Sequence, residues 1–187
     1  MKKIVQFGFL LSLIFLSSCQ ESQNEFKIGQ NQVGQIKAQT EVHELESIFS
    51  QDSIVKPDLK NRFRATNNDY YVYQEGELAL KIQPRKAQDS TSHISEIQIL
   101  NPAYKTDKGL HANSTFKDLY DNYKIKNIQN SLKNVIIDLE DSGIYVVIDK
   151  KHLPSSLKFD SSAKVSKTQI PDDAPFKYFW FSFTEEK

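Results

Sequence analysis

The fold is decided by Val135-Ile-Ile-Asp-Leu139, the turn Glu140-Asp-Ser-Gly143 and Ile144-Tyr-Val-Val-Ile-Asp149. Two runs rich in β-branched residues flank a short turn that contains glycine, which is typical of a β-hairpin. Ile144, Val146 and Ile148 alternate onto one face of the second strand. The sequence therefore predicts an antiparallel hairpin here, with one apolar face.

A second hairpin of the same kind is predicted earlier in the chain. Tyr70-Tyr-Val-Tyr-Gln74 is followed by a Glu75-Gly76 turn and then by Leu78-Ala-Leu-Lys-Ile-Gln83. Each hairpin is followed by a polar loop and a third apolar run, Ile94–Leu100 in the first half and Phe176–Phe183 in the second. Three strands are therefore expected in each half of the chain.

A short amphipathic helix is expected before each hairpin. Gly34 and Gly109 each open a short extended stretch that ends at a threonine, Thr40 or Thr115. Thr115 with Asp118 three residues later approximates a capping box, and Thr40 is expected to cap the first helix. The apolar residues after each threonine recur at helical spacing. The order helix, strand, strand, strand thus occurs twice, which favours an internal duplication over a chance likeness of two short helices.

This order predicts an α+β fold of two tandem modules, each with one helix packed on a three-stranded antiparallel sheet. The first module covers residues 34–101 and the second covers residues 102–187, with a seam at Asn101-Pro102. Gly34, Gly109, Thr40 and Thr115 also carry a resemblance to tandem repeats of the β-lactamase-inhibitor-protein fold. That fold occurs in the small lipoprotein component of the outer-membrane assembly machine and implies protein binding rather than catalysis. Its members open with two helices, for which Asp58–Phe63 and Lys126–Lys133 are the candidate second helices.

The chain begins with a predicted export signal. Lys2 and Lys3 precede an apolar run from Ile4 to Leu16, and Ser17-Ser18 are small residues at a cleavage point. The run is shorter than the ~20 residues needed to span a bilayer. Leu16-Ser-Ser-Cys19 resembles the lipobox of bacterial lipoproteins, which implies a signal peptide over 1–18 and palmitate and related acyl chains on Cys19. An ordinary secretory signal and an uncleaved anchor are the alternatives.

The composition of the remaining chain restricts its partners. Cys19 is the only cysteine, so no disulfide can form within the chain. Residues 1–18 contain two lysines and no acid, so their removal changes the formal charge from 0 to −2. No charge excess favours nucleic acid. The polar, aperiodic residues 19–33 predict a lipidated flexible tether.

Catalytic and metal-binding patterns are missing from the sequence. The histidines show no i, i+4 pair and no cysteine cluster. Acidic pairs occur in predicted turns or at the chain end, where solvation explains them. Ser155-Ser-Leu-Lys158 matches a four-letter spacing of penicillin-binding enzymes without the other motifs of those enzymes. We therefore expect no enzyme activity, no metal and no cofactor. The histidines and acidic pairs are His43, His93, His111, His152, Glu140-Asp141, Asp172-Asp173 and Glu185-Glu186.

Phe176-Lys-Tyr-Phe-Trp-Phe-Ser-Phe183 is apolar on both faces. Such a strand is usually central and covered on both sides. The alternative is that one face, with Tyr178 and Trp180, binds a partner, since both residue types are favoured interface anchors.

These features predict a lipid-anchored cell-envelope protein with a non-catalytic, protein-binding or scaffolding role. Its partners are expected to be a membrane, contacted through the acyl chains on Cys19, and other envelope proteins. Gln20 follows the cysteine, and the resemblance to lipoproteins then favours the outer membrane, on either of its faces. A carrier of an apolar ligand is the alternative, suggested by the aromatic residues in the predicted strands. A concave aromatic pocket would favour the carrier, and a flat exposed aromatic patch would favour the protein binder.

Overall fold

The computed structural model describes residues 25–56, 68–158 and 161–184. Over these ranges the chain forms twelve strands in two sheets, with short helices between them. The larger sheet has eight strands in the order β4-β5-β6-β7-β12-β11-β10-β9, and every neighbouring pair is antiparallel. Its strands are β4 (Ser53–Val55), β5 (Tyr70–Gln74), β6 (Glu77–Pro84), β7 (Ile94–Ile99), β9 (Ile125–Asn130), β10 (Asn134–Leu139), β11 (Ile144–Asp149) and β12 (Tyr178–Ser182).

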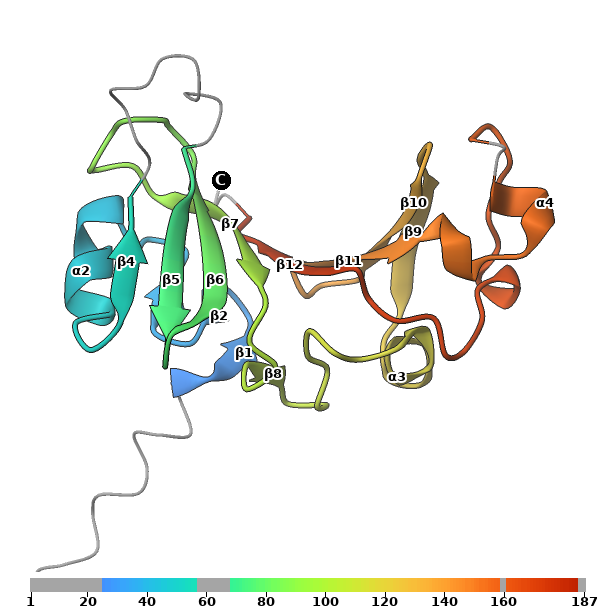
Figure 1. The fold of residues 1–187 in the computed structure, drawn as a ribbon, viewed down its shortest axis with the longest axis horizontal. Helices are drawn as coiled ribbons and strands as arrows, with labels where there is room; N and C mark the ends of the chain where they lie inside the picture. The colour runs from blue at the N-terminus through green and yellow to red at the C-terminus, as the bar shows by residue number, and fades with distance from the viewer. Residues whose placement is uncertain (1–24, 57–67, 159–160, 185–187) are drawn as a thin grey trace, which may run out of the picture.

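The predicted α+β class, with one helix on a three-stranded sheet in each module, is wrong. The fold is mostly β, because each half of the chain supplies four strands and β7 pairs with β12 to join them into one sheet. Pairing these two strands satisfies backbone groups that two separate sheets would leave at open edges. The boundary at residue 101 therefore does not separate two sheets (Figure 1).

Two segments form strands that the sequence analysis did not predict. Lys126–Lys133, a candidate second helix, lies in β9 and the turn after it, while Asp58–Phe63 lies outside the described residues. Residues 27–33, assigned to the flexible tether, contain strands β1 (Lys27–Gly29) and β2 (Gln32–Val33). Ile28 and Val33 are buried, so the folded body begins earlier than expected.

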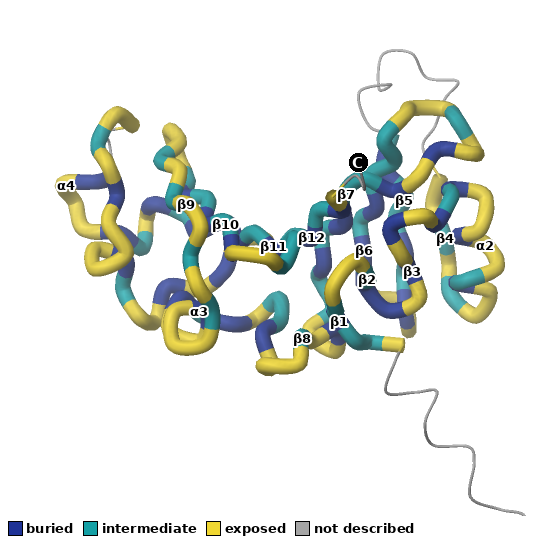
Figure 2. The backbone as a smooth tube through the Cα atoms, turned by 180° about the vertical axis from the view of Figure 1, so that it is seen from behind, coloured by how far each residue is buried: buried dark blue, intermediate teal, exposed yellow. Residues whose placement is uncertain are grey.

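The smaller sheet covers one face of the larger one. Its order is β3-β2-β1-β8, where β3 is Ile36–Lys37 and β8 is Lys105–Thr106. Figures 1 and 2 show it behind β5 and β6 as seen in Figure 1. Ile28, Val33 and Ile36 belong to the same buried cluster as Leu80 and Ile82 of β6. The first half of the large sheet is thus covered on the back by strands rather than by the predicted helix.

The helices are short and lie between strands. They are η1 (Val42–Glu44), α2 (Leu45–Ile48), α3 (Phe116–Asn122), η2 (Lys150–His152), α4 (Ser155–Lys158) and η3 (Lys167–Gln169). The predicted capping box of α3 is confirmed, since the Thr115 amide donates to Asp118 Oδ2 at 2.8 Å. At the first helix the cap is Glu41 with Glu44, and Thr40 Oγ1 instead accepts from the Lys37 amide.

The segment between β11 and β12, predicted as a long polar loop, contributes to the core of the second half. Leu153, Leu157, Val165 and Ile170 are all buried in the common cluster, to which Phe116 and Leu119 of α3 also belong. Figure 1 shows α3 and α4 around the second half of the sheet, with β12 and β11 bridging the two ends of the molecule. One face of the large sheet is therefore packed along its whole width.

Both predicted hairpins are confirmed. β5 pairs with β6 and β10 with β11. Glu75 and Gly76 both have positive φ, as the two-residue turn between β5 and β6 requires.

Candidate functional site

The side of the large sheet opposite the packed one carries a row of large and polar side chains. Lys81, Gln98, Trp180, Tyr145 and Asp138 stand directly opposite one another on β6, β7, β12, β11 and β10. Residues opposite one another in antiparallel strands share a face of the sheet. We call this side the open face; it also carries Tyr71, Tyr178 and Glu96.

The strand β12 shows the difference between the two faces most clearly. Phe179 and Phe181 are 1% and 0% exposed, whereas Tyr178 is 40% exposed and Trp180 is partly exposed. β12 is therefore a central strand, as expected, but only one of its two faces is buried. Both aromatic residues singled out in the sequence lie on the uncovered side.

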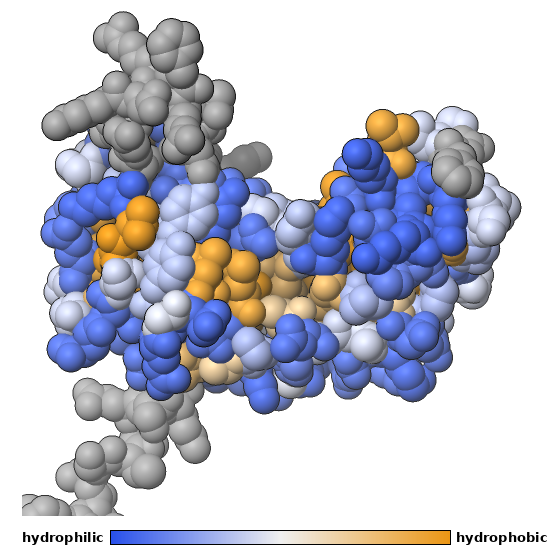
Figure 3. All heavy atoms as spheres, in the orientation of Figure 1, coloured by the Kyte–Doolittle hydropathy of each residue, from blue (hydrophilic) through white to orange (hydrophobic). Residues whose placement is uncertain are grey.

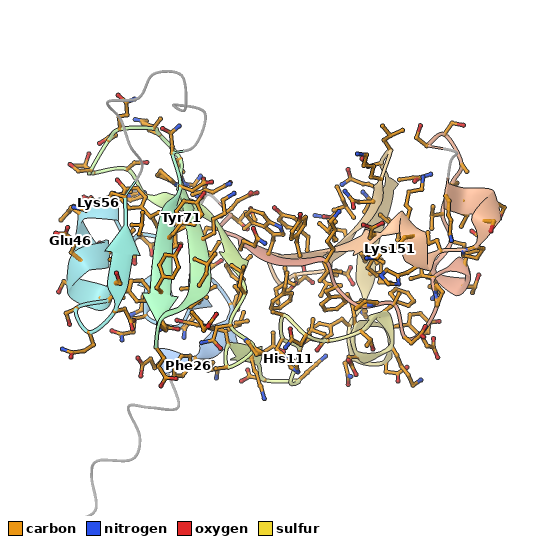
Figure 4. The ribbon with its side chains drawn as sticks, viewed as in Figure 1. Phe26, Glu46, Lys56, Tyr71, His111 and Lys151 are labelled. Atoms are coloured by element: carbon orange, nitrogen blue, oxygen red, sulfur yellow. The ribbon has the colours of Figure 1, made fainter. Side chains whose placement is uncertain are left out.

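The open face is visible from the front in Figures 3 and 4. Tyr71 lies on the viewer's side of β5, away from the smaller sheet behind it (Figure 4). Figure 3 shows hydrophobic side chains gathered over β6 and β7, and a hollow between the two ends of the molecule. The uncovered surface is therefore continuous from the first half of the sheet toward the seam with the second.

At the centre of the open face, Trp180 is held between two neighbours. Its ring stacks on the Tyr145 ring with centroids 5.8 Å apart and an angle of 5° between the planes. The Lys81 ammonium lies 5.8 Å from the Trp180 centroid and is itself paired with Asp69 at 2.8 Å. Cation–π and stacking contacts thus occupy the surroundings of the indole. The arrangement presents a fixed surface of mixed aromatic and polar character.

Two carboxylates act on Tyr145. Its hydroxyl donates to Glu96 Oε2 at 3.1 Å, and Asp138 stands opposite it on β10. Burial raises the pKa of Tyr145 well above 10, and the negative charge and hydrogen bond of Glu96 and the charge of Asp138 raise it further. Burial likewise raises the pKa of Tyr104, which lies in the core. Both phenols are therefore held neutral in the folded protein.

The raised pKa values predict how the tyrosines ionise in an alkaline titration. Burial raises the pKa of three of the eight tyrosines, Tyr104, Tyr123 and Tyr145. The shifts are largest for Tyr104 and Tyr145, which should stay protonated well above pH 10 until the protein unfolds. A phenol whose pKa is raised by folding releases its proton more readily when unfolded, so stability falls as the pH rises past 10. Absorbance at 295 nm during an alkaline titration measures the ionised fraction.

The variant Glu96→Gln separates the two phenols. Removing that charge should lower the pKa of Tyr145 and leave the pKa of Tyr104 unchanged, so one more tyrosine ionises before unfolding. Ionisation of every tyrosine near pH 10 in the folded protein would contradict the assignment.

A groove lies beside α3, away from the aromatic row of the open face. It has a volume of about 670 Å³ and is lined by Tyr120, Tyr123, Lys124, Ile125, Glu140 and Lys167. A volume in this range fits a small ligand. Charged side chains make up half of the lining, however, and Lys167 Nζ lies 5.0 Å from the centroid of the Tyr120 ring. The lining does not match the apolar, aromatic pocket that a carrier of an apolar ligand needs.

The histidines and acidic pairs are not brought together. His43 lies in η1, His93 just before β7, His111 between β8 and α3, and His152 in η2. Within the described ranges, no three His, Cys, Asp or Glu side chains are placed to hold a metal ion. Glu140-Asp141 lies at the β10–β11 turn and Asp172-Asp173 precedes β12, while Glu185-Glu186 and Cys19 lie outside these ranges.

Ser155 and Lys158 fall within α4, a helix of four residues at the edge of the packed layer. His111 Nδ1 lies 3.2 Å from the Asn113 amide, and burial lowers its pKa. In the residues that the structure describes, no helix is both long and apolar enough to cross a membrane.

Tyr145, Lys81, Glu96 and Asp138 were not singled out by the sequence. Tyr145 lies between Ile144 and Val146. Because these two apolar residues point to the core, the alternation of the strand places Tyr145 on the other face. The sequence of β11 alone does not predict that Tyr145 stacks on Trp180, because the stack depends on β12 lying beside β11.

Comparison with known proteins gives the fold and no function. No family model and no curated protein matches this chain. Among solved structures, it is similar to the crystal structure of the uncharacterized protein yfeY from Escherichia coli. The TM-score is 0.53 at 17% sequence identity, and the match covers 83% of this chain and 99% of that chain. At this identity the likeness shows a shared fold alone.

Proposed function

We propose that this chain is a lipid-anchored protein of the cell envelope that binds another protein through the open face, without catalysis. The observation that carries the proposal is the aromatic row on an uncovered sheet face. The inner strands of the large sheet bury their side chains on one side, whereas on the other side Tyr178 is exposed and Trp180 and Tyr145 are partly exposed. Tyrosine and tryptophan at a partly exposed surface are typical of protein interfaces.

The anchor in this proposal is Cys19, the one cysteine of the chain, at the end of the lipobox-like Leu16-Ser-Ser-Cys19. The resemblance favours the outer membrane and leaves the face of that membrane open. Lys27 is already paired in the smaller sheet, so few residues separate the lipid from the folded body. A partner would then meet the open face close to the membrane surface.

Site-specific photo-crosslinking tests the proposal in cells. Tyr178 on the open face and Tyr120 on α3 form a matched pair, because they are the same residue type and are 40% and 41% exposed. Each is replaced in turn by p-benzoylphenylalanine, and membranes are irradiated and analysed by mass spectrometry. We expect a discrete protein adduct from position 178 and none of comparable yield from position 120.

Three other outcomes would overturn the proposal. Equal adducts from the two positions would mean that exposure alone decides the yield. Lipid adducts without protein at position 178 would favour the carrier of an apolar ligand. The absence of any adduct at position 178, with the variant present at normal abundance, would exclude a docked protein on the open face.

A further inference from the structure

The charges of the open face are unevenly compensated. Asp69 is paired with Lys81 at 2.8 Å, and Asp149 is paired with Lys177 at 3.3 Å. Glu96 and Asp138 make no ion pair with any lysine, arginine or histidine of the described ranges, and their donors are neutral. The centre of the face thus carries two carboxylates whose charge this part of the chain leaves uncompensated.

Each of these carboxylates keeps an oxygen for a further donor. Glu96 accepts the Tyr145 hydroxyl on Oε2, and Asp138 accepts the Gln129 amide at 3.0 Å and the Asn127 amide at 3.4 Å, both on Oδ2. A carboxylate has about four lone-pair positions. The remaining capacity is therefore on Glu96 Oε1 and Asp138 Oδ1, on either side of the Tyr145–Trp180 stack.

The aromatic stack between the carboxylates narrows the chemistry of the occupant. A guanidinium is planar, lies well against aromatic groups and can donate to a carboxylate oxygen while it does so. An ammonium is more strongly hydrated and has no planar face with which to stack on a ring. The chain already shows the attraction of a cation to this site, because Lys81 lies over Trp180 on the side away from Tyr145. Tyr145 itself is neutral and does not compete for the cation.

We infer that the protein docked on the open face presents arginine side chains to Glu96 and Asp138, on the two sides of the Tyr145–Trp180 stack. This inference rests on the proposed function, since it names the chemistry of the surface that the open face binds. Two surface carboxylates alone would not indicate a binding site. These two carboxylates flank the Tyr145–Trp180 stack, and the other acids named above on this face are paired with lysines. This arrangement favours a partner surface that is flat and basic.

Trp180 allows a direct measurement, because it is the only tryptophan of the chain. The full-length protein in detergent micelles is titrated with the peptide acetyl-Arg-Leu-Arg-Leu-Arg-amide while Trp180 fluorescence is recorded. The matched probe has citrulline at each arginine position, which keeps the shape and removes the charge. We expect the arginine peptide to bind at least about tenfold more tightly, as one charged hydrogen bond supplies a factor of this size.

Three variants locate the effect. Glu96→Gln and Asp138→Asn should each weaken binding of the arginine peptide about five- to tenfold. Asp107→Asn changes the net charge equally, at an exposed residue paired with Lys27 of the smaller sheet, and should leave binding unchanged. Equal affinity for the citrulline peptide, or an equal loss from Asp107→Asn, would overturn the inference.

These results are separable from a failure of the proposed function. A protein adduct at position 178 together with no preference for arginine would leave docking intact and refute only the arginine assignment. No adduct at position 178 would refute docking itself, whatever the peptides do.

Discussion

Phe181→Ala is expected to lower the free energy of unfolding by about 3–5 kcal/mol, the usual range for truncating a buried phenylalanine. Phe181 is fully buried, stands opposite Ile144 on one side and Ile97 on the other, and its ring lies 4.9 Å from that of Phe183. The substitution therefore opens a cavity at the seam between the two halves of the sheet. Urea unfolding followed by Trp180 fluorescence measures the loss.

Tyr178→Ala is the matched control on the same strand. Its side chain is on the open face and 40% exposed, so its removal should cost less than about 1 kcal/mol. Losses of similar size from the two variants would contradict the one-sided burial of β12, on which the open face depends.

Cys19→Ala is expected to release nearly all of the protein from membranes. The lipobox resemblance implies three acyl chains on Cys19, and each buried CH₂ group contributes about 0.8 kcal/mol to membrane binding. Without the sulfur no acyl chain can be attached, and the variant should move from the detergent phase to the aqueous phase in a phase-separation assay. Metabolic labelling with palmitate should disappear at the same time.

The folded body provides the internal control for this experiment. Cys19 is the only cysteine, so its replacement removes no disulfide, and the unfolding transition should be unchanged. A variant that stays in the detergent phase without label would show that something other than acylation holds the protein to the membrane.

Local signals in the sequence predicted the hairpins and one helix cap well. The alternation of Ile144, Val146 and Ile148 and the Gly143-containing turn determine β11 and its pairing with β10. The box of Thr115 and Asp118 uses residues three apart, and it forms as expected. Such features depend on neighbours within a few residues, which a single sequence contains.

Pairing between distant strands could not be read in the same way. Nothing in Ile94–Ile99 indicates that Tyr178–Ser182 lies beside it, and this one pairing changes two modules into one sheet. The strand β9 is polar on most positions, because it lies at the sheet edge with one side in solvent. Its sequence Ile125–Asn130 therefore lacks the apolar run that identified the other strands.

In the candidate site, too, features within one strand were predicted, and contacts between distant strands were not. Tyr178 and Trp180 were chosen from their own strand and lie on the uncovered side of it. Glu96 and Tyr145 meet only because β7, β12 and β11 are adjacent. A helix precedes four strands of the large sheet in both halves of the described chain, α2 with β4–β7 and α3 with β9–β12, but η2, α4 and η3 lie between β11 and β12 in the second half. The internal duplication stays a prediction.

The position of β12 has a consequence for how the chain reaches its native state. β12 follows both β7 and β11 along the chain yet lies between them in the sheet, so neither neighbour can complete its hydrogen bonds until Tyr178–Ser182 pairs with it. Contacts that join segments so distant along the chain form slowly. The two halves of the sheet are therefore expected to join late in folding, and a chain without Tyr178–Ser182 would expose two unpaired edges to aggregation.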